Sequence, residues 1–218
     1  GKGPAWANSL FEDNAEHGLG LYLGQKAIRN RLAAKTEALI AIDYTDEAIK
    51  AAGKEWLDTM EDGEANAEAT KKYVAALQAA VKADCPCEAC TLGRDILRDQ
   101  EYLVKKSVWI FGGDGWAYDI GYGGVDHVLA SGEDVNIFVF DTEVYSNTGG
   151  QASKASNIGQ VAQFAAAGKV MPKKSLAEIA MTYGYVYVAQ VAMGANPTQT
   201  LKAIAEAEAY HGPSLIIG

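Results

Sequence analysis

The chain has 218 residues, of which 49% are hydrophobic and 22% are charged, as in an ordinary globular protein. The length suits one large α/β domain or one domain with an appendage. A formal net charge of −9 argues against a nucleic-acid partner, which would require clustered Lys and Arg. No apolar run is long enough to cross a membrane and no targeting segment opens the sequence, so no membrane partner is expected.

Both ends of the sequence suggest a piece of a longer polypeptide. The start, Gly1-Lys2-Gly3-Pro4, is typical of the interior of a loop, and the apolar run Leu215 to Ile217 is followed only by Gly218. Native chains seldom end on a core strand without a cap or tail. We therefore expect other domains of the same polypeptide to be partners of this one.

Residues 1–43 are predicted to form a helical lead-in, with a helix that begins near residue 5. Asn8 or Ser9 can cap this helix, and the helix dipole would favour Glu12 and Asp13 in its first turn. Three glycines inside the pattern would each cost about 1 kcal/mol relative to Ala. They are Gly18, Gly20 and Gly24. Such glycines suggest a close approach by another backbone or a ligand, with a kink as the alternative.

Residues 44–106 are rich in Ala, Glu, Asp and Lys and are predicted to be a variable helical insertion. Tyr73, Leu77 and Val81 recur every four residues and give a helix one apolar stripe. Trp56 begins a shorter stripe. We expect this helical excursion to end in a cysteine-containing loop, and to serve for packing or for a subunit contact.

The three cysteines lie together in Cys85-Pro86-Cys87-Glu88-Ala89-Cys90. An odd, clustered set is unlike the framework of a secreted disulfide-bonded domain, so a cytoplasmic protein is expected. Free thiols are the favoured interpretation and a disulfide comes second. A metal site comes third, because a closed thiolate site needs a fourth ligand.

Residues 107–218 alternate between strand and helix patterns and are predicted to be an α/β core, within one domain that covers 1–218. The expected strands are Val108 to Phe111, Val135 to Phe140, Tyr185 to Val191 and Leu215 to Ile217. The expected helices are Tyr122 to Ala130, Ile158 to Ala167, Leu176 to Tyr183 and Thr198 to Tyr210, the last capped by Asn196 and Pro197. Strands joined by helices imply a parallel sheet covered by helices on both faces. In such sheets, ligands bind beyond the carboxyl ends of the strands.

Two loops at these strand ends combine glycines with small oxygen-bearing side chains. Gly112-Gly113-Asp114-Gly115-Trp116 follows the first strand, and Asp141 to Gln151 follows the second. A Mg²⁺ ion that carries a diphosphate needs oxygen ligands, typically one or two carboxylates with phosphate and water. Asp114 can supply the carboxylate, Thr142 or Asn147 a side-chain oxygen, and the loop a backbone carbonyl. Gly113 and Gly115 can bring N–H groups close to phosphate oxygens.

Longer motifs around these loops carry a family resemblance. They are Gly113 to Gly124 (GDGWAYDIGYGG), Asp141 to Lys154 (DTEVYSNTGGQASK), Tyr183 to Ala189 (YGYVYVA) and Gly3 to Glu16 (GPAWANSLFEDNAE). Together they resemble the thiamine-diphosphate-binding domain of pyruvate:ferredoxin (or flavodoxin) oxidoreductases. The resemblance covers residues 1–43 and 107–218 almost end to end, and is poor in 44–106.

By this resemblance, Asp114, the Thr142 hydroxyl and the Val144 carbonyl would ligate Mg²⁺. The residues that would line thiamine diphosphate are Gly113, Asp114, Gly115, Trp116, Thr142, Glu143, Val144, Tyr145, Ser146 and Asn147. Asn147 would also reach the reacting substrate and is the one catalytic residue expected. Trp116 has plain core packing as an equal alternative.

The resemblance implies oxidative decarboxylation of pyruvate, with coenzyme A taking the acetyl group. Electrons would pass through 4Fe-4S clusters to ferredoxin or flavodoxin, in a homodimer. The cluster cysteines and the glutamate that activates the cofactor would lie outside this chain, so the chain alone is expected to be inactive. The alternatives are a domain of a different 2-oxoacid:ferredoxin oxidoreductase, and a cofactor-binding module without turnover.

Overall fold

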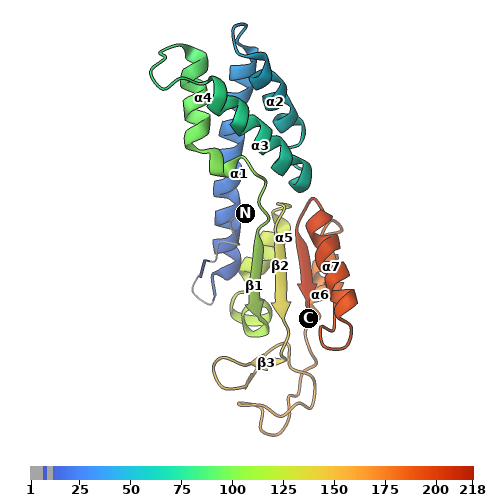
Figure 1. Cartoon of the computed structure of the whole chain (residues 1–218). Helices are drawn as coiled ribbons and strands as arrows, with labels where there is room; N and C mark the ends of the chain where they lie inside the picture. The colour runs from blue at the N-terminus through green and yellow to red at the C-terminus, as the bar shows by residue number, and fades with distance from the viewer. Residues whose placement is uncertain (1–6, 9–11) are drawn as a thin grey trace. The chain divides into compact units, whose positions relative to one another are not determined.

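The computed structural model describes residues 7–8 and 12–218, and these fall into two compact units (Figure 1). The α/β unit contains the described residues up to Tyr22 together with Ser107–Gly218, and the helical unit is Leu23–Lys106. The second boundary coincides with the predicted start of the α/β core, whereas the first lies inside a helix. The predicted loop at Gly1 to Pro4, the helix start near residue 5 and the Ser9 cap lie outside the described residues.

The centre of the α/β unit is a parallel four-stranded sheet in the order β1-β2-β6-β5. Strands β1 and β2 lie side by side in Figure 1. The strands are β1 Trp109–Gly113, β2 Asn136–Phe140, β5 Tyr187–Gln190 and β6 Ser214–Ile217. All four predicted strands are therefore confirmed, each within two residues of its expected limits. The predicted parallel direction is confirmed as well.

Helices cover both faces of this sheet. Successive side chains of a strand point to opposite faces, so each strand can contribute to a core on either side. On one face, Ile137 and Val139 of β2 pack in a core with residues from three α-helices and from the segment that follows β1. These helices are α5 Tyr122–Ala130, α6 Leu176–Met181 and the first turns of α1 Asn14–Ala41. On the other face, Phe138 packs against α7 Pro197–Ala209, which Asn196 caps as predicted. The predicted sheet with helices on both faces is confirmed.

The predicted helix Ile158 to Ala167 is wrong. Gly159 and Phe164 have φ angles of 78° and 64°, which a right-handed helix cannot contain. The segment instead folds back on itself, with the N–H of Gly159 donating to the carbonyl of Lys169 at 2.8 Å. Ile158, Val161 and Phe164 are 66%, 71% and 93% exposed, so no core supports a helix there.

Helix α1 begins later than predicted, at Asn14. Glu12 and Asp13 therefore lie in a turn before the helix, and Asn8 does not cap it. Gly18 does allow a close approach, because a Cβ atom there would lie 2.4 Å from Cγ1 of Ile110 on β1. At Gly20 and Gly24 a Cβ atom would meet nothing within 4 Å, so the close-approach interpretation is wrong for those two.

The helical unit confirms the predicted helical character of residues 44–106. Its helices are α2 Glu47–Asp58, α3 Gly63–Ala80 and α4 Glu88–Arg98, followed by the 3-10 turn Gln100–Tyr102. Trp56, Tyr73 and Leu77 from the predicted stripes are fully buried in the core of this unit. The unit does not end at the cysteine loop, because α4 follows that loop. Within the described part of the chain, no helix is long and apolar enough to span a membrane.

Candidate functional site

The two predicted loops leave the sheet side by side. Gly113, the last residue of β1, pairs in register with Phe140, the last residue of β2. The chain therefore delivers Asp114 and Asp141 to the same carboxyl edge at the same level. After Asp114, a π-helix runs over Gly115–Ile120, and the second loop contains the short antiparallel pair β3 Val144–Tyr145 and β4 Gln151–Ala152.

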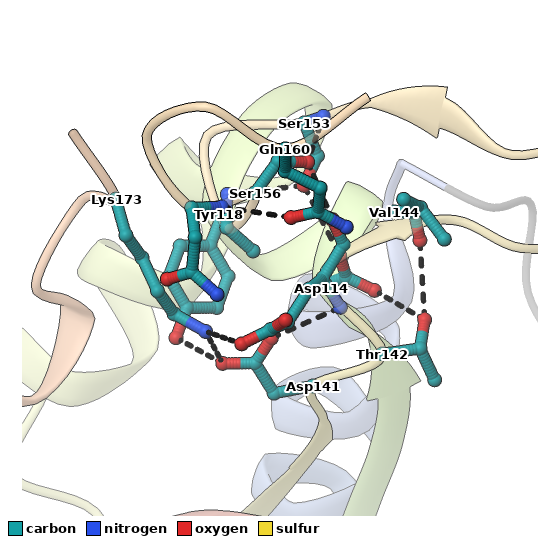
Figure 2. Close-up of polar contacts among 12 residues, drawn as sticks. Asp114, Tyr118, Asp141, Thr142, Val144, Ser153, Ser156, Gln160 and Lys173 are labelled. Carbon is teal, nitrogen blue, oxygen red and sulfur yellow. Dashed lines mark hydrogen bonds and ion pairs between the residues drawn. The ribbon is translucent and has the colours of Figure 1, made fainter. Parts of the chain in front are cut away.

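Asp114 is a buried carboxylate held by two hydroxyl groups. Asp114 is only 1% exposed to solvent. Thr142 Oγ1 donates to one carboxylate oxygen at 3.0 Å, and Ser153 Oγ donates to the other at 3.1 Å (Figure 2). Burial raises the pKa of Asp114 above its ordinary value, although the two hydroxyl hydrogen bonds favour the charged form. A cation beside this carboxylate would offset the cost of its burial.

Three oxygen atoms converge around Thr142. Its single hydroxyl hydrogen faces two acceptors, since Oγ1 lies 3.0 Å from Asp114 Oδ1 and 3.1 Å from the Val144 carbonyl oxygen (Figure 2). Neighbouring ligands of an octahedral Mg²⁺ with bonds of 2.0–2.1 Å are about 2.8–3.0 Å apart. The carboxylate, hydroxyl and carbonyl oxygens are of the chemical type that Mg²⁺ prefers, and the two distances from Thr142 Oγ1 are close to that edge length.

A small cleft opens beside these oxygens. Its lining residues are Gly113, Asp114, Gly115, Val144, Tyr145, Ser146, Asn147 and Thr148. A Cβ atom on Gly113 would meet nothing within 4 Å, so there is open space directly above the strand end. A Cβ atom on Gly115 would lie 2.4 Å from the Tyr145 ring, so Gly115 lets the two loops touch. The cleft therefore opens next to the converging oxygens, at the ends of the two strands.

Three of the residues predicted for the cofactor lie outside the lining of this cleft. The Trp116 side chain is 1% exposed and packs in the α/β core, and its indole N–H has no hydrogen-bond partner among the described residues. Only the backbone of Trp116 is available to a ligand. Glu143 has a φ of 64° and its carboxylate is 3.5 Å from Lys173 Nζ. Thr142 does not line the cleft, but its hydroxyl oxygen lies beside the oxygens of Asp114 and Val144.

Sequence patterns alone did not single out the groups that fasten the two loops together. Tyr118 donates its hydroxyl to Asp141 Oδ2 at 2.8 Å, and Lys173 Nζ lies 2.6 Å from the same oxygen (Figure 2). Burial raises the pKa of Tyr118, and the neighbouring Asp141 raises it further. Ser153, which holds Asp114, was also missed. Tyr118 and Asp141 lie inside the quoted motifs, whereas nothing in the sequence marks Lys173.

A family model described as "Thiamine pyrophosphate enzyme, C-terminal TPP binding domain" matches residues 92–217. The chain is 56% identical over 217 residues to a "Pyruvate-flavodoxin oxidoreductase" from Klebsiella pneumoniae. It is 55% identical over 218 residues to a "Pyruvate:ferredoxin oxidoreductase" from Moorella thermoacetica. Each match covers 100% of this chain, which spans 18% of either relative. A solved 2-oxoglutarate:ferredoxin oxidoreductase from Magnetococcus marinus is 24% identical, with a TM-score of 0.45 over 50% of this chain and 38% of that one.

Proposed function

Because the chain belongs to the family of C-terminal TPP-binding domains of thiamine pyrophosphate enzymes, we propose that its carboxyl-edge loops hold Mg²⁺ and the diphosphate of that cofactor. Asp114, the Thr142 hydroxyl and the Val144 carbonyl are the proposed metal ligands. The observation that carries this proposal is that Thr142 Oγ1 lies 3.0 Å from Asp114 Oδ1 and 3.1 Å from the Val144 carbonyl oxygen, close to the edge length of a Mg²⁺ octahedron.

Each group has a separate task at this site. The Asp114 carboxylate supplies negative charge to the metal, and Ser153 fixes its second oxygen by a hydrogen bond of 3.1 Å. Gly113 leaves open space for phosphate oxygens. The contacts of Asp141 with Tyr118 and Lys173 hold the second loop against the first, so that Thr142 and Val144 stay in place. When bound, the cofactor supplies the carbanion that attacks a keto carbon.

We infer further that the polypeptide containing this chain oxidises pyruvate to acetyl-CoA and CO₂. The support is the identity of 56% and 55% to relatives with pyruvate oxidoreductase names, across the whole of this chain. Electrons would pass through 4Fe-4S clusters to ferredoxin or flavodoxin, in a cytoplasmic homodimer. Asn147, which lines the cleft, would contact the reacting substrate. The cluster ligands and the activating glutamate would come from other domains of the same polypeptide.

Calorimetric titration of the chain with thiamine diphosphate, with and without Mg²⁺, tests the cofactor site. Asp114→Asn should weaken Mg²⁺-dependent binding by at least about tenfold, since even the loss of a group behind a metal ligand costs about 10–100-fold. Asp126→Asn is the matched control, because Asp126 accepts a hydrogen bond from Tyr183 in α/β packing and an amide oxygen can replace it. Unchanged binding in Asp114→Asn would refute the site.

An assay of the whole polypeptide tests the reaction separately. We expect pyruvate-dependent and coenzyme A-dependent reduction of a low-potential acceptor, and loss of turnover in Asn147→Ala with cofactor binding largely kept. Turnover only with a branched or aromatic 2-oxoacid would contradict pyruvate as the substrate and leave the cofactor site intact.

A further inference from the structure

The cysteine loop between α3 and α4 gathers three thiols at one point. The Sγ atoms of Cys85, Cys87 and Cys90 all lie within 4.8 Å of one another, although the residues are spread over a turn and the start of a helix. The three cysteines are free and partly exposed. Cys85 Sγ lies 3.1 Å from Cys87 Sγ, well beyond the disulfide bond length of about 2.05 Å.

The spacing of these sulfur atoms fits thiolate ligands of one metal ion. With metal–sulfur bonds of about 2.3 Å, two thiolates on a tetrahedral ion lie about 3.8 Å apart, and on a trigonal ion about 4.0 Å. The distance of 3.1 Å between the Cys85 and Cys87 sulfur atoms is shorter than these values, and the upper limit of 4.8 Å for all three sulfur–sulfur distances is longer. Side-chain adjustments of a fraction of an ångström therefore suffice, without movement of the backbone.

The backbone of the loop is held by contacts that do not involve the thiols. Arg94 Nη1 donates to the carbonyls of Lys82 at 2.7 Å and of Cys85 at 2.8 Å, and Nη2 donates to Thr91 Oγ1 at 3.1 Å. A Cβ atom on Gly93 would lie 2.5 Å from Val81, so α4 packs tightly on the residue before the loop. Ligands on a backbone fixed in this way lose little conformational freedom when a metal binds.

The N-terminus of α4 and a guanidinium group lie beside the three thiols. Cys87 is the N-cap of α4, and its Sγ accepts a hydrogen bond from the N–H of Cys90 at 3.4 Å. The helix N-terminus and the Arg94 guanidinium would both stabilise the net negative charge of three thiolates around one divalent cation. Three thiolates are soft ligands, which select Zn²⁺ or Cu(I) over Mg²⁺.

We propose that Cys85, Cys87 and Cys90 bind a thiophilic cation of the Zn²⁺ class through three thiolates, with the fourth position open. Among the residues that the structure describes, no His, Asp, Glu or further Cys joins this group. Water or a small external thiol would therefore complete the coordination, and the ion would exchange more readily than from a closed four-ligand site. This site lies in the helical unit and does not depend on the proposed cofactor function.

The test uses the reduced full chain under anaerobic conditions, with Zn²⁺ measured by competition against a chromophoric chelator. Co²⁺ serves as a second probe, because thiolate ligation gives a charge-transfer absorption. We expect one bound equivalent per chain, a thiolate–Co²⁺ band, and protection of all three thiols from alkylation when Zn²⁺ is present.

Two variants separate ligation from folding. Cys87→Ser should lose Zn²⁺ affinity by at least about a hundredfold and the thiolate–Co²⁺ band should weaken, while α4 stays folded because Ser is itself a preferred N-cap residue. Arg94→Gln, which keeps all three thiols, should weaken binding by about tenfold.

Three results would overturn the proposal: no Zn²⁺ binding by the reduced chain, equal binding after replacement of all three cysteines by Ser, or alkylation at the same rate with and without Zn²⁺. Circular dichroism of each variant confirms that a loss of binding does not come from unfolding.

Discussion

At the scale of single residues, Tyr73 shows how the burial of an ionisable group makes folding stability depend on pH. Its ring is fully buried and stacks on Trp56 with centroids 6.0 Å apart, and its hydroxyl donates to Thr36 Oγ1 at 3.1 Å. Burial raises the pKa of Tyr73 to about 12. Below the ordinary tyrosine pKa of about 10 both the folded and the unfolded chain keep the proton, so Tyr73 adds no pH dependence there.

We predict that the stability of the helical unit falls as pH rises from about 10 through the folded pKa of about 12, since only the unfolded chain ionises this tyrosine freely in that window. Tyr73→Phe should reduce this alkaline loss. At neutral pH it should cost only about 1 kcal/mol, because Thr36 still donates to the Leu32 carbonyl at 2.9 Å. Urea unfolding at neutral and alkaline pH measures both effects. An unchanged alkaline loss in the variant would contradict the assignment.

Thr142 is the residue that joins the two loops of the candidate site. Thr142→Val keeps the shape of the side chain and removes the oxygen shared between Asp114 and Val144. We predict that Mg²⁺-dependent affinity for thiamine diphosphate falls by about tenfold or more, measured by calorimetry. Thr148→Val is the matched control, because Thr148 lines the same cleft but bonds Gln151 at 2.6 Å. Equal losses in the two variants would show that the hydroxyl of Thr142 has no special role.

Site residues that directly follow strands could be predicted from the sequence, whereas the residues that hold them by hydrogen bonds and ion pairs could not. Asp114 and Thr142 follow apolar strands directly, so their meeting at one sheet edge could be predicted from the parallel topology. Ser153 contacts Asp114, which lies 39 residues earlier in the chain. Lys173 contacts Glu143, which lies 30 residues earlier. Such contacts depend on the path of an irregular loop, for which no periodicity exists.

At the scale of secondary-structure elements, Gly18 and Gly20 of α1 form a matched pair. Gly18→Ala would place a methyl group 2.4 Å from Cγ1 of Ile110, so we predict a loss of about 1–3 kcal/mol in unfolding free energy. Gly20→Ala meets nothing within 4 Å and should stabilise the helix by up to about 1 kcal/mol. Denaturant unfolding of the two variants measures the difference. Equal effects would show that Ile110 moves aside without cost.

The elements that could be predicted are those whose apolar residues are buried. Successive apolar side chains of β2 and β6 point alternately into two cores, one on each face of the sheet. Ile158, Val161 and Phe164 also recur at a helical spacing, yet these side chains are mostly exposed. Periodicity predicts a helix only when a core receives the apolar stripe. The positive φ at Phe164 belongs to a non-glycine residue and has no signal in the sequence.

At the scale of the whole molecule, each of the two units has its own buried core. We predict that thiamine diphosphate with Mg²⁺ slows hydrogen exchange in β1 and β2 but leaves exchange in α3 unchanged. A ligand at a hundred times its Kd stabilises the unit that binds it by about 2.7 kcal/mol. Hydrogen exchange resolved by peptide measures this difference.

Leu77→Ala provides the reciprocal control. Leu77 is fully buried in the helical unit, and its truncation should cost about 2–5 kcal/mol there. The affinity for thiamine diphosphate should stay within about twofold of the unchanged chain, because all proposed ligands lie in the α/β unit. A loss of affinity as large as that expected for Asp114→Asn would show that the two units are energetically coupled.

The most direct test of the three-oxygen metal site is a crystal structure of the chain grown with thiamine diphosphate and Mn²⁺. Mn²⁺ accepts the same oxygen ligands as Mg²⁺, and its anomalous scattering marks its position. We predict one peak about 2 Å from Asp114 Oδ1, Thr142 Oγ1 and the Val144 carbonyl oxygen, with the diphosphate beside Gly113. A peak on other carboxylates, such as Asp119 or Asp141, or a diphosphate outside the cleft, would contradict the site.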